Sequence, residues 1–264
     1  MSDLPDGWGP SLPPNDTIVR EYIESYGDLI EALARSGGHR SLRTREFVAF
    51  DTHTPFPFFN GAVPLRPIHD ARDPMLDEIS EFLEPDEENT PFLIYSGTPL
   101  PDLRSRGWTL MGHPPFMLRP AGPADVPAPD GLEIVEVRDA ETLEAFDRTL
   151  VEAYPVPPLR GRRTFWPGIL ELPGWHMWLG LLEGQPVGTA AARVTESLVD
   201  VEWISTMPSA RGRRIGEALT WTATLAAPEL PATLIASDLG QPTYERMGYL
   251  RVSRFTLWVG ARTG

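Results

Sequence analysis

The pattern of hydrophobic positions in the second half of the chain switches between the period of a strand and that of a helix. From Leu132 to Val137, apolar residues alternate with acidic ones, which is typical of a strand with one buried face. From Ala140 to Ala153, apolar residues recur every three or four positions, which predicts a helix, and Asp139 can cap its first turn. The same reasoning predicts strands over 175–182, 187–194, 198–207, 233–237 and 251–259, and helices over 215–226 and 242–247. This order predicts a mixed α/β (α+β) sheet with helices on its faces.

A segment rich in Pro, Gly and Ala divides the chain into two parts of similar size. Residues 119–131 can neither continue a helix nor lie in a sheet, so they are predicted to form a linker. We therefore expect an N-terminal domain over residues 1–118 and a second domain over residues 132–264.

The composition is that of a soluble globular protein and excludes several classes of function. Hydrophobic residues make up 41% and charged residues 23% of the chain, and no apolar run approaches the ~20 residues that span a bilayer. Residues 1–14 lack the basic and apolar regions of a secretory signal, so we expect a cytoplasmic protein. The absence of cysteine excludes disulfides and thiolate chemistry. The net charge of −14 argues against nucleic acid and membrane partners.

One segment of the second half has the composition of an anion-binding site. A predicted strand ends near Met207, a short basic loop follows, and a helix begins near Ile215. A helix start offers free backbone N–H groups and a positive dipole end, and glycines at 212 and 216 let a ligand approach the backbone. With three arginines added, this segment is suited to a pyrophosphate. It has the spacing of neither a Walker loop nor a dinucleotide fingerprint.

Arg211-x-x-x-Ile215-Gly216 resembles the pyrophosphate loop of the GNAT superfamily of N-acetyltransferases, which usually reads Arg/Gln-x-x-Gly-x-Gly/Ala. Arg214 stands where the first glycine is expected, and we expect a helical arginine to fit there. A second segment, Pro242 to Tyr249, resembles the family's Tyr-Glu-x-x-Gly-Phe motif. The resemblance implies acetyl-CoA as co-substrate and direct acetyl transfer to an amine. The five histidines show no metal-ligand spacing, so no metal is expected. The implied cofactor-binding residues are Ile204, Ser205, Thr206, Met207, Arg211, Gly212, Arg213, Arg214, Ile215, Gly216 and Glu217.

The resemblance also assigns the candidate catalytic groups. Tyr244 occupies the position of the family's general acid, which protonates the leaving thiolate; its alternative role is packing of the short helix. Glu202 and Asp200 share one face of a strand, and Glu202 is the first choice for the base, with Asp200 second. Both could instead be solvated or ion-paired carboxylates. Many relatives have no dedicated base and rely on water.

The first half carries a faint copy of the second at a constant offset of 141 residues. Pro101 then corresponds to Pro242, and Gly107 to Gly248. The same register places Asp70, Asp73 and Met75 on Arg211, Arg214 and Gly216. Carboxylates would repel phosphates, so the first copy is predicted to be GNAT-like but without a cofactor site. This arrangement resembles actinobacterial GNAT proteins with a degenerate N-terminal half, which the tract Pro57 to Gly61 also fits; Asn60-Gly61 has a second interpretation as a turn.

The sequence leaves the acceptor open. We expect a primary amine of a small molecule or a peptide, bound near the loop 154–168, with Tyr154, Trp166, Trp175 and Trp203 as candidate walls. His176 is expected to be structural. The alternative function is a non-catalytic acyl-CoA-binding sensor or interaction module. The first half is expected to pack against the second and either to cover the acceptor site or to form the interface of a homodimer.

Overall fold

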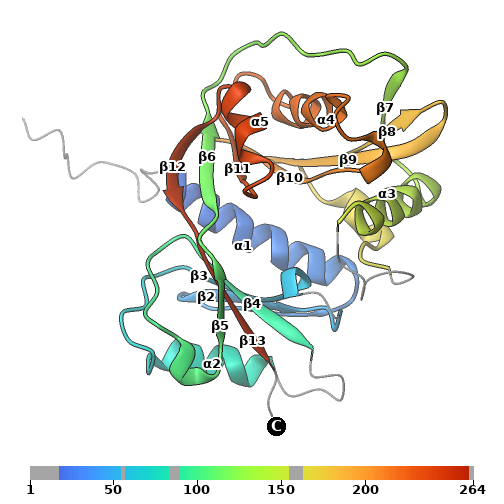
Figure 1. Ribbon diagram of the computed structural model, residues 1–264. Coiled ribbons are helices and arrows are strands. Elements are labelled where there is room, and N and C mark those ends of the chain that lie inside the picture. Colours follow the sequence, from blue (N-terminus) through green and yellow to red (C-terminus); the bar gives the residue numbers. More distant parts are fainter. Residues whose placement is uncertain (1–17, 55–56, 84–89, 155–162, 262–264) are drawn as a thin grey trace, which may run out of the picture.

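Two mixed sheets form the framework of the computed structural model, which describes residues 18–54, 57–83, 90–154 and 163–261 (Figure 1). The first sheet has the order β1-β2-β3-β4-β13-β5, and the second has the order β12-β6-β11-β10-β9-β8-β7. The strands are β1 (Arg40–Arg43), β2 (Phe47–Asp51), β3 (Asn60–Pro64), β4 (Pro91–Ser96), β5 (Thr109–Gly112), β6 (Pro115–Arg119), β7 (Leu132–Glu136), β8 (Trp175–Leu182), β9 (Gln185–Val194), β10 (Val199–Thr206), β11 (Ala232–Ile235), β12 (Leu250–Arg254) and β13 (Thr256–Ala261). The helices are α1 (Ile18–Ser36), α2 (Pro74–Phe82), α3 (Ala140–Ala153), α4 (Ile215–Thr224) and α5 (Gln241–Arg246), with short 3₁₀ turns η1 (Pro57–Phe59), η2 (Arg104–Arg106), η4 (Pro167–Glu171) and η5 (Pro208–Ala210).

The internal repeat is confirmed by the positions of the elements. The pairs α2 and α4, β4 and β11, β5 and β12, and β6 and β13 each begin 141 residues apart, at 74 and 215, 91 and 232, 109 and 250, and 115 and 256. The mixed α/β fold class of both halves is confirmed as well.

The two halves exchange their last strands. Strand β6 of the first half lies between β11 and β12 in the second sheet, and β13 of the second half lies between β4 and β5 in the first. The predicted single strand over 251–259 is therefore wrong, because the chain passes from one sheet to the other at the fully buried Phe255. The predicted boundaries at 118 and 132 follow the sequence repeat, whereas each sheet takes a strand from across the linker.

Helix α1 lies between the two sheets (Figure 1). Its residues Leu29 and Leu33 pack with α3 and with β8 of the second sheet. Its residues Tyr22 and Ile30 pack with β2 and β4 of the first sheet. Leu219 of α4 covers the opposite face of the second sheet. The first half thus packs directly against the second and shares its core.

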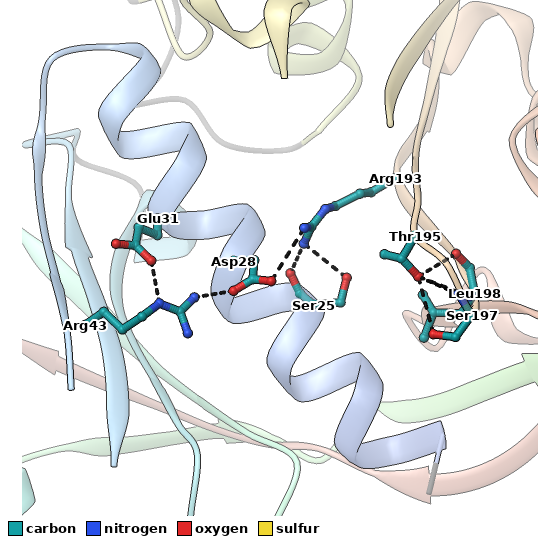
Figure 2. Close-up of polar contacts among 8 residues, drawn as sticks. All are labelled: Ser25, Asp28, Glu31, Arg43, Arg193, Thr195, Ser197 and Leu198. Carbon is teal, nitrogen blue, oxygen red and sulfur yellow. Dashed lines mark hydrogen bonds and ion pairs between the residues drawn. The ribbon is translucent and has the colours of Figure 1, made fainter. Parts of the chain in front are cut away.

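An ion-pair network holds α1 between the sheets (Figure 2). Arg193 of β9 donates to the backbone carbonyl and, at 3.1 Å, to the hydroxyl of Ser25, and it lies 3.6 Å from the Asp28 carboxylate. Arg43 of β1 pairs with Asp28 from the other side and with Glu31 at 2.5 Å. Asp28 therefore links an arginine of each sheet.

Asn60 and Gly61 begin β3 rather than forming a turn. The Asn60 side chain is fully buried; it donates to the carbonyls of Thr54 and Pro91 and accepts from the Thr52 N–H. A Cβ atom on Gly61 would lie 1.9 Å from the Leu93 carbonyl oxygen, so only glycine fits. Among the described residues, no helix is long and apolar enough to cross a bilayer.

Candidate active site

Strand β10 is interrupted by a β-bulge in the middle of the second sheet. Glu202 pairs with Ala191 and Ser205 with Thr189, so two residues of β10 oppose one of β9. Trp203, one of the two, has a φ of 49°, in the left-handed region. The bulge brings the Trp203 side chain among the aromatic residues of the α3 side of the sheet.

The same strand separates from its other neighbour. β10 and the parallel strand β11 pair only at Val199 with Ala232 and at Asp200 with Thr233. Beyond Asp200, the edge of β10 that faces β11 has no strand partner in the described part of the chain. This separation leaves the edge of β10 beyond Asp200 open to an extended ligand, at the groups that are not bound elsewhere.

Three of the predicted strand-end residues already have a backbone group engaged within the protein, and one of these groups is the Thr206 carbonyl, which accepts from Arg211. The Met207 N–H donates to the Val187 carbonyl at 2.8 Å, and the Ile204 carbonyl accepts from the Tyr154 hydroxyl at 3.3 Å. Ser205 and Thr206 remain in register with β9. The role of these four residues in acetyl-CoA binding stays a prediction.

The start of α4 is open to an anion. Arg214, its N-cap residue, makes no side-chain capping bond, so the first N–H groups of the helix keep their hydrogen-bonding capacity. Ile215 is buried, and a Cβ on Gly216 would lie 2.8 Å from the Thr206 Oγ1, so the helix start packs closely on the end of β10. Gly212 has a φ of 77°, and a Cβ atom added there would meet no other atom within 4 Å.

Arg214 corrects one expectation from the sequence. Its φ of 59° and ψ of 16° are left-handed, whereas we expected a helical arginine. The loop turns sharply into α4 here, and glycine, which the resemblance leads us to expect at this position, adopts a left-handed conformation without steric cost.

The three arginines of the loop have different surroundings. Arg211 donates to the carbonyls of Thr206 and Ala153, both at 3.2 Å, and so joins β10 to the carboxyl end of α3. Arg214 forms a bidentate pair with Glu217 at 2.8 and 3.0 Å. Arg213 is exposed and has no hydrogen-bond or ion-pair partner among the described residues. Arg213 is therefore the side chain most available to a phosphate.

The two carboxylates of β10 differ in their environments. Asp200 is fully buried, and neither of its oxygens has a hydrogen-bond partner among the described residues. Arg193 lies opposite it in the ladder but is bound to Ser25 of α1. Burial, followed by the charge of Glu202, raises the pKa of Asp200 well above its usual value, although Arg193 opposes this.

Glu202 is only partly buried and accepts a hydrogen bond from Tyr22 of α1 at 3.4 Å. Burial raises the pKa of Glu202 to about 8, and the Tyr22 hydrogen bond limits that rise. A carboxylate with a pKa near neutral is suited to accept an amine proton, whereas burial and the charge of Glu202 favour the protonated form of Asp200. The geometry thus favours Glu202 over Asp200 as the candidate base.

Tyr244 lies on α5, packed against the core on the α4 side of the second sheet, and it is close enough to Tyr154 and Glu202 for their charges to affect its pKa. Its ring covers Gly240, where an added Cβ would be 2.8 Å from the ring carbon Cε2. Burial, with smaller effects of Tyr154, Tyr249 and Glu202, raises the pKa of Tyr244, so its hydroxyl keeps its proton at neutral pH. Burial and the charge of Glu202 raise the pKa of Tyr154 to about 12. The hydroxyl of Tyr244 can therefore act as a proton donor.

The candidate acceptor walls come together only in part. Trp203 is half-buried, and its ring centroid is 4.4 Å from that of Phe165 and 5.0 Å from that of Trp175. Trp166 instead packs against His39 of the first half, with their ring centroids 4.3 Å apart. Residues 155–162 of the predicted acceptor loop lie outside the described residues. The ring of His176 stacks on that of Trp178, with the two centroids 5.8 Å apart. No group of His, Asp and Glu suited to a metal ion occurs in the described ranges.

The equivalent position in the first half is closed to anions. Asp73 caps α2 by accepting from the Met75 N–H at 3.0 Å, and Pro74 follows it. Arg66 binds the same carboxylate at 2.6 and 2.8 Å, which holds the pKa of Asp73 below its usual value. β2 and β3 pair in continuous register without a bulge. A carboxylate therefore lies at the helix start that α4 leaves open, so acetyl-CoA fits the second half and not the first.

Sequence reasoning did not identify Tyr22 and Tyr95. Tyr22 lies in α1 and Tyr95 in β4, and their hydroxyls are 3.0 Å apart. No motif marks either residue, because both reach the site only through the packing of the first half on the second.

Comparisons with known proteins agree with this geometry. Residues 140–249 match the model of the acetyltransferase (GNAT) family. A GCN5-related N-acetyltransferase from Kribbella flavida superposes with a TM-score of 0.66 at 22% identity, over 94% of this chain and 96% of that one. A putative GNAT acetyltransferase from Novosphingobium aromaticivorans gives a TM-score of 0.57 at 16% identity, over 92% and 96%. A tandem GNAT protein from the clavulanic acid biosynthesis pathway gives 0.51 at 14%, over 92% and 96%.

No curated protein sequence shows significant similarity to the chain. At these identities the structural likenesses establish the fold alone. Residues 140–249 thus match the GNAT acetyltransferase family, and the chain has the tandem GNAT fold over most of its length.

Proposed function

We propose that this protein is an acetyl-CoA-dependent N-acetyltransferase that moves the acetyl group directly to a primary amine of a small molecule or peptide. The observation that carries the proposal is the open start of α4 beside the bulged and splayed end of β10, the strand that carries Glu202. GNAT acetyltransferases use acetyl-CoA, which supplies the acetyl group as a thioester.

The residues of the chain have separate roles in this reaction. The N–H groups at the start of α4 and the side chain of Arg213 hold the pyrophosphate. Glu202 takes the proton that the amine nitrogen loses as it bonds to the acetyl carbon, directly or through one water. Tyr244 gives its hydroxyl proton to the thiolate as the carbon–sulfur bond breaks. Because Glu202 must be deprotonated and its pKa is about 8, kcat/KM is expected to rise with pH up to that region.

Calorimetric titration with acetyl-CoA tests the binding step. We expect binding by the intact chain and a loss of affinity of roughly ten- to a hundredfold in Arg213→Ala, since a charge-assisted hydrogen bond contributes roughly 1.5–3 kcal/mol. Arg148→Ala is the matched control, because Arg148 is also an exposed arginine but lies on α3. Absence of binding by the intact chain would refute the proposal.

A thiol-release assay with a panel of amines tests the chemistry. We expect turnover with at least one primary amine, and at least a hundredfold lower kcat in Tyr244→Phe. The second candidate function is a sensor that binds acyl-CoA without transferring the group. It is favoured by the arginine in the left-handed loop position, and binding without turnover across the panel would support it over the enzyme.

A further inference from the structure

A chain of hydroxyl groups connects the first half of the protein to Glu202. The Tyr22 hydroxyl donates to Glu202 Oε1 at 3.4 Å and lies 3.0 Å from the Tyr95 hydroxyl. A phenol has one proton to donate, so when Tyr22 donates to Glu202, Tyr95 must donate to Tyr22. The chain therefore begins in the first sheet, passes through α1 and ends on the candidate base in the second.

The rings that carry these hydroxyls are held firmly. Tyr22 is fully buried, and its ring centroid lies 4.8 Å from that of Phe116 and 5.3 Å from that of Phe255. Tyr95 is also buried, and Tyr26 stacks on it at 4.4 Å. Phe116 belongs to the exchanged strand β6, and Phe255 precedes the exchanged strand β13, so the strand exchange itself fixes the ring of Tyr22.

Tyr22 is the one side chain that donates a hydrogen bond to Glu202 among the described residues. The titratable and charged groups that act on this carboxylate and its neighbours come from five elements and from the C-cap residue of α3, which is Tyr154. They are Tyr22 and Tyr26 of α1, Tyr95 of β4, Asp200 of β10, Arg193 of β9, Tyr244 of α5, and Tyr154. Arg193 is the one cation in this set, and it is bound to Ser25, so Tyr22 is left to stabilise the carboxylate.

We propose that Tyr22 is a positioning residue for Glu202, supported by Tyr95, so that the degenerate first half supplies part of the active site of the second. The proposal rests on the proposed function, in which Glu202 is the base. Tyr22 orients Oε1 and favours the deprotonated form that accepts the amine proton. The first half then contributes to catalysis although its own helix start is closed.

The test compares Tyr22→Phe with the unchanged full-length chain, with Tyr26→Phe as the matched control. Tyr26 belongs to the same aromatic cluster, but its hydroxyl makes no hydrogen bond to Glu202. In Tyr22→Phe we expect the acid limb of the kcat/KM profile to move up by about one pH unit, with recovery at higher pH. Tyr95→Phe should move the limb in the same direction by less, and Tyr26→Phe should leave it in place.

Carbon-13 NMR titration of the Glu202 carboxyl, assigned with Glu202→Gln, gives a readout that does not depend on turnover. A higher pKa in Tyr22→Phe supports the proposal, and an equal pKa in the two proteins overturns it. A uniform loss of kcat/KM at every pH would also overturn it, because it indicates a purely structural role. If Glu202→Gln retains full activity and the original profile, the assignment of the base in the proposed function fails instead.

Discussion

The left-handed conformation of Arg214 leads to a prediction that separates backbone strain from charge. The residue caps α4 with a φ of 59°, where an L-residue with a Cβ is strained and glycine is not. We compare Arg214→Gly with Arg214→Ala. Both substitutions remove the guanidinium and its ion pair with Glu217. The Arg214 side chain is 65% exposed, so this pair is largely solvated. The difference between the two variants therefore reports the Cβ at this position alone.

The magnitude follows from two opposing effects. A Cβ in the left-handed region costs roughly 1–2 kcal/mol, and glycine loses about 0.5–1 kcal/mol more than alanine in conformational entropy on folding. The glycine variant should thus be the more stable by about 1 kcal/mol. For a chain of this size, this corresponds to roughly 2–4 °C in Tm.

Differential scanning fluorimetry and urea unfolding of both variants measure the difference. The control is the same pair of substitutions at Arg213, which is not among the residues with positive φ. There alanine should be as stable as glycine or more stable, by about 0.4–1 kcal/mol. If the alanine variant is also the more stable one at position 214, the left-handed cap is not strained and the reasoning fails.

Two further substitutions test the packing of the halves. Gly61→Ala should lower the free energy of unfolding by at least about 2 kcal/mol, because its Cβ would meet the Leu93 carbonyl oxygen at 1.9 Å. Unchanged stability in urea would show that β3 and β4 can separate at this point. Arg193→Met keeps the aliphatic part of the side chain but loses the bonds to Ser25, so Tm should fall by more than in the control Arg138→Met, which breaks an exposed pair. Equal losses in the two variants would argue that the network holding α1 adds no stability.

The sequence was sufficient for the element types and for the repeat. Strand and helix periods are local properties, and the offset of 141 residues that aligns Gly107 with Gly248 also separates the starts of four pairs of elements. The open helix start was predictable for the same reason, because a strand, a glycine-containing basic loop and a helix lie next to one another in the chain.

The partners of the charged side chains could not be predicted. Nothing in the sequence distinguishes Arg211, Arg213 and Arg214. In the structure, Arg211 binds carbonyls of β10 and α3, Arg214 pairs with Glu217, and Arg213 has no partner in the described part of the chain. The partner of Arg211 depends on the position of the last residue of α3, Ala153, which the local sequence does not determine. The strain at Arg214 was missed because a left-handed residue leaves no periodic pattern, and the contact of Tyr22 with Glu202 joins residues 180 positions apart.

The strand exchange gives the degenerate half a physical reason to persist. Without β6, strands β11 and β12 would lose their common neighbour, and the second sheet would be split at the side of α5. Without β13, strands β4 and β5 would separate in the same way. The first half, whose helix start is closed to anions, is therefore still required to complete the sheet of the second half. Helix α1 adds a second constraint, since Tyr22 reaches Glu202 from the same half that supplies β6. Substitutions at the start of α2 should therefore be tolerated better than substitutions that displace β6 or α1.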